Sequence, residues 1–522
     1  MNTDVKKRRD VMFVRVNSIG LFGMKSFGVG VEASIENGFP RMDIVGLPDA
    51  AVNESKDRVR SAIKNNGFKY SDKRITVNLT PADVRKEGPV YDLPILIALL
   101  IASGQLQCDI NKSAFIGELS LSGKVRNLKG TLSMVIKAKN LGMTEIFVPA
   151  GNSCECCVVN GIDIYPVQNV KQLVDHLKGI KKIRKLSKEL YSEYTRPAEY
   201  TPDFSDVKGQ YQAKRALEIA AAGGHNVLMI GPPGSGKSML AKRIPSILPD
   251  MTFEESLAVT EIHSIAGFLP DNVSLIKSRP FRSPHHTIST AGLSGGGRIP
   301  SPGEVSLAHH GVLFLDELPE FQKNTMEALR QPIEDGKITI SRVSGTLTYP
   351  CEVMLVCAMN PCPCGYYGHP TRKCSCPSGS AAKYLSKVSG PLLDRLDIHI
   401  EVPQVDFEKL SDDKPAEPSS EIKKRVNKAR RIQNERFKGT TVTCNAKMAP
   451  DMTRKYCALD DKCKALLEKC FTSLDLSARA YDKILRIART IADLDGSDNI
   501  QLEHITEAVQ YRNLDRKFWG TK

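Results

Sequence analysis

The segment at residues 231–238 constrains the fold most, because its residues follow the order that a phosphate-binding loop requires. It reads Gly-Pro-Pro-Gly-Ser-Gly-Lys-Ser, between an apolar run of strand type at 226–230 and a run at 239–244 that can begin a helix. Such glycines let backbone N–H groups close on phosphates, and the helix N-terminus favours their negative charge. We expect Lys237 to reach the β- and γ-phosphates and the Ser238 hydroxyl to bind Mg²⁺. The other predicted nucleotide-binding positions are Gly231, Pro232, Pro233, Gly234, Ser235 and Gly236.

A second segment, 311–318, supplies the acidic residues that nucleotide hydrolysis needs. It is an apolar strand that ends in Asp316 and Glu317. We expect Asp316 to complete the coordination of Mg²⁺ and Glu317 to activate the attacking water. Asn360 ends the next apolar strand and is placed to orient that water. Together these residues predict an ATPase that converts ATP and water to ADP and phosphate.

Composition sets the wider limits. The 522 residues suffice for about three domains of typical size. The basic stretch at 1–10 has no apolar core, and the longest apolar run, 93–102, is too short to span a bilayer. We therefore expect a cytoplasmic protein. The net charge of +14 permits a polyanionic partner but is also compatible with an ordinary solvated surface.

Periodicity and charge divide the chain into three folded parts and two linkers. The first part mixes strand-like and helical patterns, the second carries the phosphate loop, and the third is helical throughout. The charged and proline-containing stretches between them are typical of linkers. The predicted boundaries are 1–180 for the first domain, 181–205 for a linker, 206–405 for the ATPase core, 406–420 for a second linker and 421–522 for a helical lid domain.

The first domain resembles the proteolytic domain of Lon-type proteases. The resemblance is carried by residues 85–89, 121–125 and 145–149. In that family a serine and a lysine form the catalytic dyad, but here the aligned positions are Val90 and Leu132. Acyl transfer needs a nucleophile and its base, so we expect a domain that lacks peptidase activity.

Two insertions in the core could contact nucleic acid. The segment 281–303 is rich in glycine and proline and contains Arg282 and Arg298 but no acidic residue. The segment 337–349 has two alternating runs around a turn signal, as in a β-hairpin, with Arg342 near its tip. Cationic loops of this kind can follow a phosphate backbone. From the residues alone, a packing loop between subunits and an ordinary surface hairpin remain open alternatives.

The cysteines include one arrangement with metal-ligand spacing. Two Cys-x-Cys pairs, Cys362 with Cys364 and Cys374 with Cys376, could together bind one structural Zn²⁺ in a tetrahedral site. A reduced, metal-free loop is the alternative. The cysteines at 154, 156 and 157 have no fourth ligand nearby and are interpreted as incidental thiols.

Four long stretches resemble the ComM/YifB family of magnesium-chelatase-like AAA+ ATPases: residues 281–286, 295–309, 389–395 and 476–481. The resemblance implies an α/β fold in which an AAA+ P-loop module with a helical C-terminal lid follows an α+β Lon-protease-like (ribosomal S5 domain 2-like) domain. It also implies a ring of identical subunits, a hexamer, with ATP bound between them. In such a ring Arg395 would act as the arginine finger on the ATP of a neighbour, and Arg479 would be the sensor of the lid.

The same resemblance implies DNA, single-stranded or branched, as the partner. ComM-type proteins act as branch-migrating helicases during natural transformation. A second class stays open, because several of these stretches are shared with magnesium chelatase: a motor that remodels a protein or drives metal insertion. A third class, an ATP-dependent protease, is disfavoured by Val90 and Leu132.

Overall fold

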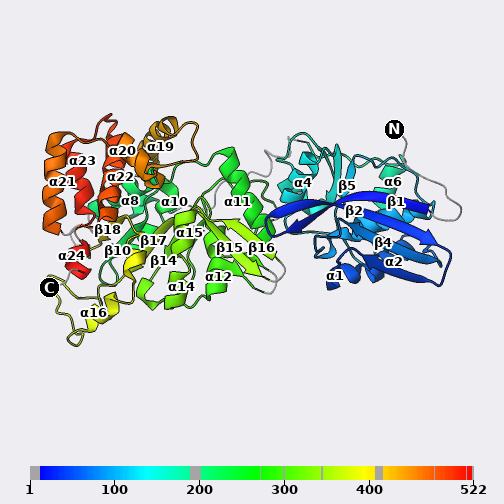
Figure 1. Cartoon of the computed structure of the whole chain (residues 1–522), viewed down its shortest axis with the longest axis horizontal. Coiled ribbons are helices and arrows are strands. Elements are labelled where there is room, and N and C mark those ends of the chain that lie inside the picture. Colours follow the sequence, from blue (N-terminus) through cyan, green and yellow to red (C-terminus); the bar gives the residue numbers. More distant parts are fainter. Residues whose placement is uncertain are drawn as a thin grey trace. The chain divides into compact units, whose positions relative to one another are not determined.

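The computed structural model describes residues 12–187, 202–270, 272–297, 300–342, 345–405, 416–474, 476–512 and 514–519 (Figure 1). Contacts divide the chain into two units, each treated separately below. Unit 1 comprises Met1–Pro197, Ser256–Ile276 and Thr339–Tyr349, and unit 2 comprises Ala198–Glu255, Lys277–Ile338 and Pro350–Lys522. Two short segments inside the range 206–405 therefore pack with unit 1 and not with the phosphate loop.

Unit 1 is built on a mixed seven-stranded sheet. In spatial order its strands are β3 (Arg41–Val45), β4 (Arg74–Thr80), β2 (Lys25–Glu36), β1 (Met12–Phe22), β5 (Ser113–Phe115), β8 (Glu145–Pro149) and β9 (Asp163–Val167). The pairs β1–β2 and β2–β4 are antiparallel, and the other pairs are parallel. Along β4 buried and partly exposed residues alternate, because successive side chains point to opposite faces of a sheet.

Helices and short elements complete unit 1. They are α1 (Ala50–Asn53), α2 (Ser55–Asn65), η1 (Pro89–Tyr91), α3 (Asp92–Ala102), β6 (Glu118–Leu119), β7 (Val125–Arg126), α4 (Thr131–Asn140), η2 (Ala150–Asn152), α5 (Ser153–Cys156) and α6 (Val170–Leu177). Helix α3 contains the longest apolar run and is buried on almost every side, so this run forms the core of the unit. None of the helices described in either unit combines the length and the apolar character that a membrane span requires.

Unit 2 contains a five-stranded parallel sheet in the order β11 (Phe281–Arg282), β14 (Val312–Leu315), β17 (Met354–Met359), β10 (Val227–Ile230) and β18 (Ile398–Glu401). Strands β10, β14 and β17 are buried at every position. Parallel strands covered on both faces read as continuous apolar runs, which is how these three strands were recognisable in the sequence. A short two-stranded ribbon of unit 2 is formed by β12 (Gly295–Gly296) with β13 (Ser301–Pro302). A second ribbon, β15 (Lys337–Arg342) with β16 (Gly345–Pro350), has most of its residues in unit 1.

The helices of unit 2 fall before, within and after the sheet. Those up to β18 are η3 (Phe204–Asp206), α8 (Tyr211–Gly223), α9 (Lys237–Ala241), α10 (Ile244–Ile247), α11 (Phe253–Ala266, which continues into unit 1), α12 (Thr290–Ser294), α13 (Glu304–Leu307), η4 (Leu318–Glu320), α14 (Lys323–Glu327), α15 (Arg330–Asp335), α16 (Ser380–Leu385) and α17 (Gly390–Leu393). The C-terminal ones are α19 (Ser419–Arg436), η5 (Asn445–Lys447), α20 (Pro450–Tyr456), α21 (Asp461–Leu474), α22 (Ala478–Asp495), α23 (Leu502–Gln510) and α24 (Leu514–Trp519).

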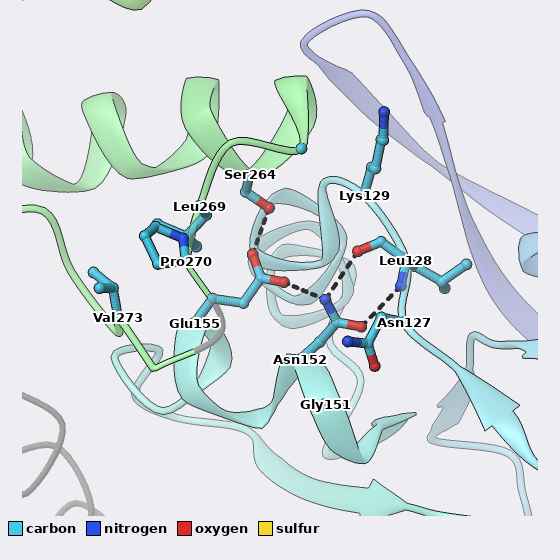
Figure 2. Close-up of a pocket in the computed structure, with 11 residues that line it drawn as sticks. Asn127, Leu128, Lys129, Gly151, Asn152, Glu155, Ser264, Leu269, Pro270 and Val273 are labelled. Carbon is cyan, nitrogen blue, oxygen red and sulfur yellow. Dashed lines mark hydrogen bonds between the residues drawn. The ribbon is translucent and has the colours of Figure 1, made fainter.

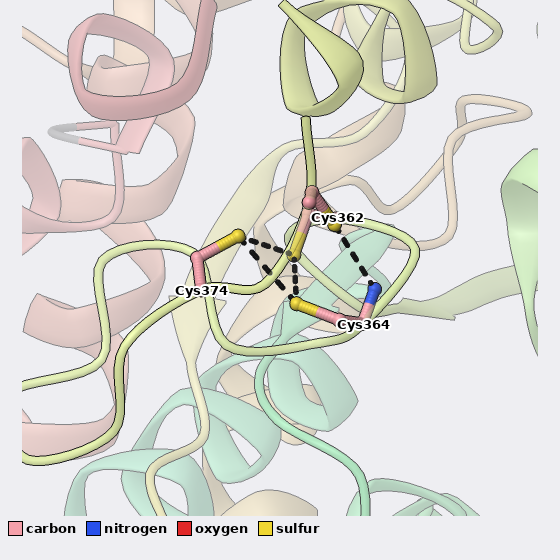
Figure 3. A group of neighbouring side chains, drawn as sticks. Cys362, Cys364 and Cys374 are labelled. Carbon is pink, nitrogen blue, oxygen red and sulfur yellow. Dashed lines mark hydrogen bonds between the residues drawn. The ribbon is translucent and has the colours of Figure 1, made fainter. Parts of the chain in front are cut away.

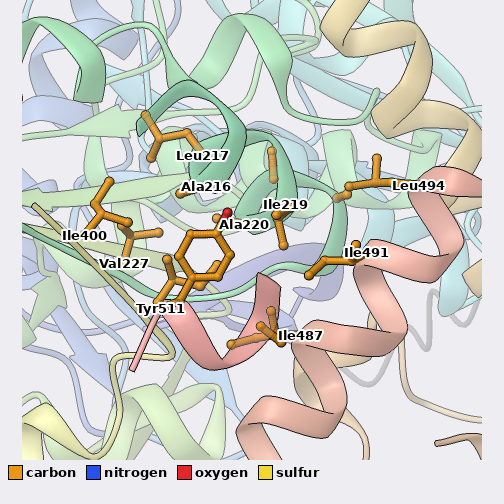
Figure 4. Close-up of a cluster of buried hydrophobic side chains, with 14 of the residues drawn as sticks. Ala216, Leu217, Ile219, Ala220, Val227, Ile400, Ile487, Ile491, Leu494 and Tyr511 are labelled. Carbon is orange, nitrogen blue, oxygen red and sulfur yellow. The ribbon is translucent and has the colours of Figure 1, made fainter. Parts of the chain in front are cut away.

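One continuous apolar core joins the sheet of unit 2 to the C-terminal helices. Figure 4 shows side chains of this core from both parts: Leu217 and Ile219 come from α8, Ile487 and Ile491 come from α22, and the ring of Tyr511 lies between Leu217 and Ile487 in this view. Burying an aliphatic side chain of this size contributes about 1.5–3 kcal/mol. The helical C-terminal part is thus held to the phosphate-loop sheet by direct packing.

Candidate nucleotide-binding site

The phosphate loop connects the end of β10 to the start of α9. Gly234 and Gly236 have φ angles of 75° and 91°, in the left-handed region where a side chain would strain the backbone. Helix α9 begins at Lys237, directly after this turn. The local sequence therefore produces a strand, a tight glycine turn and a helix N-terminus, in the order that an anion site needs.

Lys237 lies folded into the loop. Its Nζ donates hydrogen bonds to the carbonyl oxygens of Gly231 and Pro232, at 2.8 and 2.9 Å, and to Oδ1 of Asn360 at 3.2 Å. Burial lowers the pKa of Lys237 to about 8, and the nearby charge of Asp316 only partly offsets this. A buried ammonium group held by neutral oxygens fits a site that receives an anion.

Sheet order brings the distant residues of the site together. Strand β17 lies between β10 and β14, so Asn360, which follows β17, stands between the phosphate loop and Asp316, which follows β14. The Ser238 hydroxyl donates to Oδ2 of Asp316 at 2.6 Å. A hydroxyl and a carboxylate in contact are the oxygen ligands that Mg²⁺ prefers, so these two residues fit the metal predicted for them.

Glu317 has a more open position. Its backbone is left-handed, with φ at 52°, and its side chain is 57% exposed. Nδ1 of His286 lies 3.4 Å from Oε2 of Glu317. His286 had no predicted role, although the adjacent histidines at 285–286 are a visible signal in the segment 281–303. An exposed carboxylate beside the predicted Mg²⁺ ligands is accessible to an attacking water.

A pocket with a volume of about 510 Å³ adjoins the phosphate loop. Its wall includes Gly231 and Pro232 of the loop, Gln210 and Tyr211 at the start of α8, and Pro403 after β18. The pocket is large enough for a nucleoside and opens beside the backbone that would hold the phosphates.

Arg395 and Arg479 line a different pocket, of about 530 Å³. Arg395 Nη2 is 2.7 Å from Oε1 of Glu334, and Arg479 Nη1 is 3.2 Å from Oδ2 of Asp394. Neither arginine borders the pocket beside the phosphate loop. The two arginines thus line one pocket, and that pocket is separate from the one beside the phosphate loop of the same chain.

A buried ion pair between Lys483 and Asp397 supports the turn that carries Arg395. Lys483 Nζ of α22 lies 3.0 Å from Asp397 Oδ1 and also donates to the carbonyl oxygen of Leu396. Burial opposes ionisation of Asp397, but the charge of Lys483 outweighs it and holds the pKa of this carboxyl well below its usual range. Helix α22 therefore sets the position of the arginine-bearing turn.

The three predicted DNA contacts have different outcomes. Arg282 Nε and Nη2 are bonded to the two carboxylate oxygens of Glu304, at 2.6 and 2.7 Å. This acidic partner lies one residue beyond the acid-free segment, so the guanidinium of Arg282 is held in a bidentate pair and is not a free cation. Arg298 and the side chain of Arg342 lie outside the described residues.

The four cysteines of the two Cys-x-Cys pairs meet in one cluster (Figure 3). Their sulfur atoms all lie within 4.8 Å of one another. This is the group of three or more metal-ligating side chains found among the described residues. The quartet could therefore bind a metal ion.

The positions that align with the Lon dyad carry no polar group. Val90 and Leu132 are both buried, and they belong to different clusters of apolar side chains. Leu132 packs with Cys157, Val158 and Leu275. These positions hold core residues and offer no nucleophile or base.

Unit 1 has a pocket of its own, of about 270 Å³ (Figure 2). Three of its polar side chains form a network: Ser264 donates to Glu155, and Asn152 donates to Glu155 at 2.6 Å and exchanges bonds with the backbone of Leu128. Burial raises the pKa of Glu155 despite these bonds. The network ties the segment Ser256–Ile276 to the rest of unit 1.

The parallel sheet, the glycine turn before α9 and the Ser238–Asp316 contact define unit 2 as a P-loop nucleotide-binding module. Comparison with known proteins narrows this class. Residues 203–410 match the family described as Magnesium chelatase, subunit ChlI, residues 31–152 match Subunit ChlI of Mg-chelatase, and residues 416–512 match the C-terminal part of that subunit.

Individual relatives cover nearly the whole chain. The protein YifB of Escherichia coli is 43% identical over 504 residues, which span 96% of this chain and 97% of the relative. The competence protein ComM of Haemophilus influenzae is 42% identical over 507 residues, with the same coverage of 96% and 97%. Lon protease 2 of Bacillus subtilis is 30% identical over 177 residues, 32% of this chain and 31% of the relative. The chain belongs to the ComM/YifB family of magnesium-chelatase-like AAA+ proteins.

Proposed function

We propose that this protein is an ATP-hydrolysing ring motor that acts on DNA, as a branch-migration helicase in recombination and natural transformation. The observation that supports the ATPase most directly is the convergence of Lys237, Ser238, Asp316 and Asn360 from three neighbouring strand ends. A phosphate loop alone binds nucleotides in many proteins, but hydrolysis also needs a metal ligand and a group that orients water.

In the proposed reaction each residue has one task. Lys237 and the backbone of residues 231–236 hold the phosphates, and Ser238 and Asp316 hold Mg²⁺, which when bound neutralises charge on the transferring phosphoryl group. Glu317 accepts the proton of the attacking water, and the amide of Asn360 orients that water. His286, at 3.4 Å from Glu317, helps to hold the carboxylate in place before reaction.

The active unit in this proposal contains more than one copy of the chain. Arg395 and Arg479 line one pocket, separate from the pocket beside their own phosphate loop. In a closed ring of identical subunits the same surface meets the nucleotide of the next subunit, so both arginines would act in trans. We propose a hexamer, with Arg395 as the finger and Arg479 as the sensor.

DNA is the proposed substrate because one of the full-length relatives is a competence protein. The net charge of +14 fits a polyanionic partner. The second candidate is a motor that remodels a protein or inserts a metal, and the specific observation in its favour is the match to a magnesium chelatase subunit over residues 203–410.

Steady-state ATPase measurements test the choice. The rate is measured without DNA, with single-stranded DNA and with forked DNA, each across a salt series, and the Glu317→Gln variant serves as the inactive control. Stimulation by DNA that fades as salt rises supports a motor that tracks phosphates, and strand displacement is then the next assay. A rate that DNA leaves unchanged even at low salt contradicts the DNA motor and favours the protein-remodelling alternative.

A further inference from the structure

The cysteine quartet has the dimensions of a tetrahedral zinc site. Zn–S bonds of about 2.3 Å place the four sulfurs of such a site about 3.8 Å apart. Here Sγ of Cys362 lies 3.4 Å from Sγ of Cys364 and 3.7 Å from Sγ of Cys374, and the last two sulfurs are 3.5 Å apart. Figure 3 shows these three sulfur atoms turned toward one another from the two arms of the loop.

Backbone groups support the cluster as they do in thiolate metal sites. The N–H of Cys364 donates to Sγ of Cys376 at 3.4 Å, and the N–H of Tyr367 donates to Sγ of Cys362 at 3.3 Å. Such bonds stabilise negative charge on sulfur and orient it toward a metal. Four cysteine ligands leave no open coordination position, so a metal here would be structural.

The loop that carries the quartet has few other means of holding its shape. Between the end of β17 at Met359 and the start of α16 at Ser380, the described residues form neither helix nor strand. Most of the loop is exposed, and Cys362 is one of its few buried residues. A segment with little apolar burial needs another source of order, and a bound metal supplies it.

This loop is also a wall of the pocket beside the phosphate loop. Pro361, Gly365, Tyr367, His369 and Thr371 all line that pocket. At Gly365 the two loops touch so closely that an added Cβ would lie 2.4 Å from Cδ of Pro233. The loop between β17 and α16 therefore carries both the cysteine quartet and part of the pocket wall.

The connection along the chain is shorter still. Asn360, whose Oδ1 accepts from Lys237 at 3.2 Å, is followed by Pro361 and then by the first ligand, Cys362. Cys362 is fully buried. A change in the cluster that shifts Cys362 must also shift the residue that faces the phosphate loop.

From these contacts we infer that the quartet binds one Zn²⁺ and that the metal-bound loop forms the base-side wall of the nucleotide site, so that ATP binding depends on the zinc. This inference rests on the nucleotide site of the proposed function and not on DNA as a substrate. Tyr367 is the side chain in this wall best suited to contact a nucleotide base, since it is an aromatic ring that is 42% exposed at the pocket.

The test measures zinc and nucleotide binding on the same full-length protein. Zinc is quantified with a chromogenic chelator after release by an organomercurial, and binding is followed by titration with a fluorescent ATP analogue in the presence of Mg²⁺. We expect one zinc per chain and a roughly tenfold loss of affinity for the ATP analogue after zinc release. Without the metal, part of the binding free energy is used to order the loop. Reloading zinc after removal of the mercurial is expected to restore the affinity.

Three variants distinguish the contribution of the bound zinc to nucleotide affinity from that of the pocket wall. Replacing Cys374 and Cys376 together by serine should abolish zinc binding and weaken nucleotide binding to the same extent as zinc release. Tyr367→Ala should retain zinc, because only the backbone N–H of Tyr367 contacts the cluster, and should weaken binding roughly fivefold through the lost ring contact. Cys108→Ser, a partly exposed thiol of unit 1, is the matched control and should change neither quantity.

The possible results are distinct. Protein without zinc that cannot be loaded overturns the metal site, and zinc-free protein that binds the nucleotide with unchanged affinity overturns the coupling. Zinc-loaded protein that fails to bind any nucleotide overturns the proposed ATPase itself and, with it, this inference. Circular dichroism of the double serine variant shows whether a loss of nucleotide binding reflects unfolding. If it does, the nucleotide affinity of Tyr367→Ala decides whether this loop is a wall of the nucleotide site.

Discussion

In unit 2 the polar side chains that phosphate chemistry needs are present and bonded to one another, whereas in unit 1 the two positions that align with a serine–lysine dyad are aliphatic. Lys237 reaches Asn360 at the end of the neighbouring strand β17, and Ser238 reaches Asp316 at the end of β14, one strand further along the sheet. Val90 and Leu132 are buried in separate apolar clusters. The residues of unit 2 can therefore support phosphate chemistry, whereas the two aligned positions of unit 1 contribute only to packing.

The two regions differ in the energetic penalty of burying a charged side chain. Burial lowers the pKa of Lys237 because its ammonium has left water, and that penalty is kept where a ligand can offset it. Leu132 carries no charge, and its buried apolar side chain stabilises the core.

The largest effect is expected at Arg395. An arginine finger contributes about 10³–10⁵-fold to phosphoryl transfer, so Arg395→Ala should lower the ATPase rate by at least about 10³-fold while nucleotide binding is retained. Arg431→Ala, an exposed arginine of α19, is the control and should leave the rate unchanged. Mixing Arg395→Ala with Lys237→Ala protein should restore part of the rate if the finger acts in trans. Absence of any rescue in mixed rings would instead point to action within one chain.

Glu317→Gln should have the next largest effect. The amide keeps the shape of the side chain but cannot accept a proton, so turnover should fall by ~10²–10⁴-fold. Binding of the fluorescent ATP analogue should stay near the wild-type level, because Glu317 is not a phosphate or metal ligand in the proposed site. Glu320→Gln, an exposed acid three residues further on, is the matched control. Turnover of the Glu317→Gln protein at the native rate would mean that another group is the base.

On the other side of the comparison, Leu132→Lys should destabilise unit 1 without creating a peptidase. Removing a buried leucine costs about 2–5 kcal/mol, and the unpaired charge adds to this, so we expect a loss of at least about 3 kcal/mol. Leu121→Lys, at a leucine that is 58% exposed, is the control and should unfold like the wild type. Thermal unfolding measures the loss, and casein digestion tests for activity. A Leu132→Lys protein of native stability would show that this position is not part of the core.

Much of the nucleotide site could be predicted from the sequence, because its signals are local. The run at 226–244 encodes strand, turn and helix within a few residues, and Asp316 and Asn360 each follow a short apolar run that is typical of a buried strand. Parallel strands end at one edge of a sheet, so their terminal side chains had to meet. The cysteine quartet was found in the same way, from its spacing.

What the sequence could not provide were pairings between distant residues. Glu304 neutralises Arg282 from just outside the segment that was considered, and His286 reaches Glu317 across the fold. The packing of Ser256–Ile276 into unit 1 depends on bonds such as that from Ser264 to Glu155, which no periodicity encodes. Such contacts follow from tertiary packing, which has no local signature.

The smallest effect concerns the pH dependence of nucleotide binding, and it tests whether Lys237 is poised as its environment suggests. With its pKa lowered to about 8 in the free site, Lys237 is mostly charged at pH 7 and mostly neutral at pH 9. ATP binds the charged form, so affinity is retained below this pKa and falls above it, by roughly tenfold between pH 7 and pH 9. Lys237→Arg should flatten this profile, because a guanidinium stays charged across the whole range. A wild-type profile as flat as that of the arginine variant would mean that burial does not destabilise the charged form of Lys237 in the free loop. The two regions would then not differ in the energetic penalty of a buried charge.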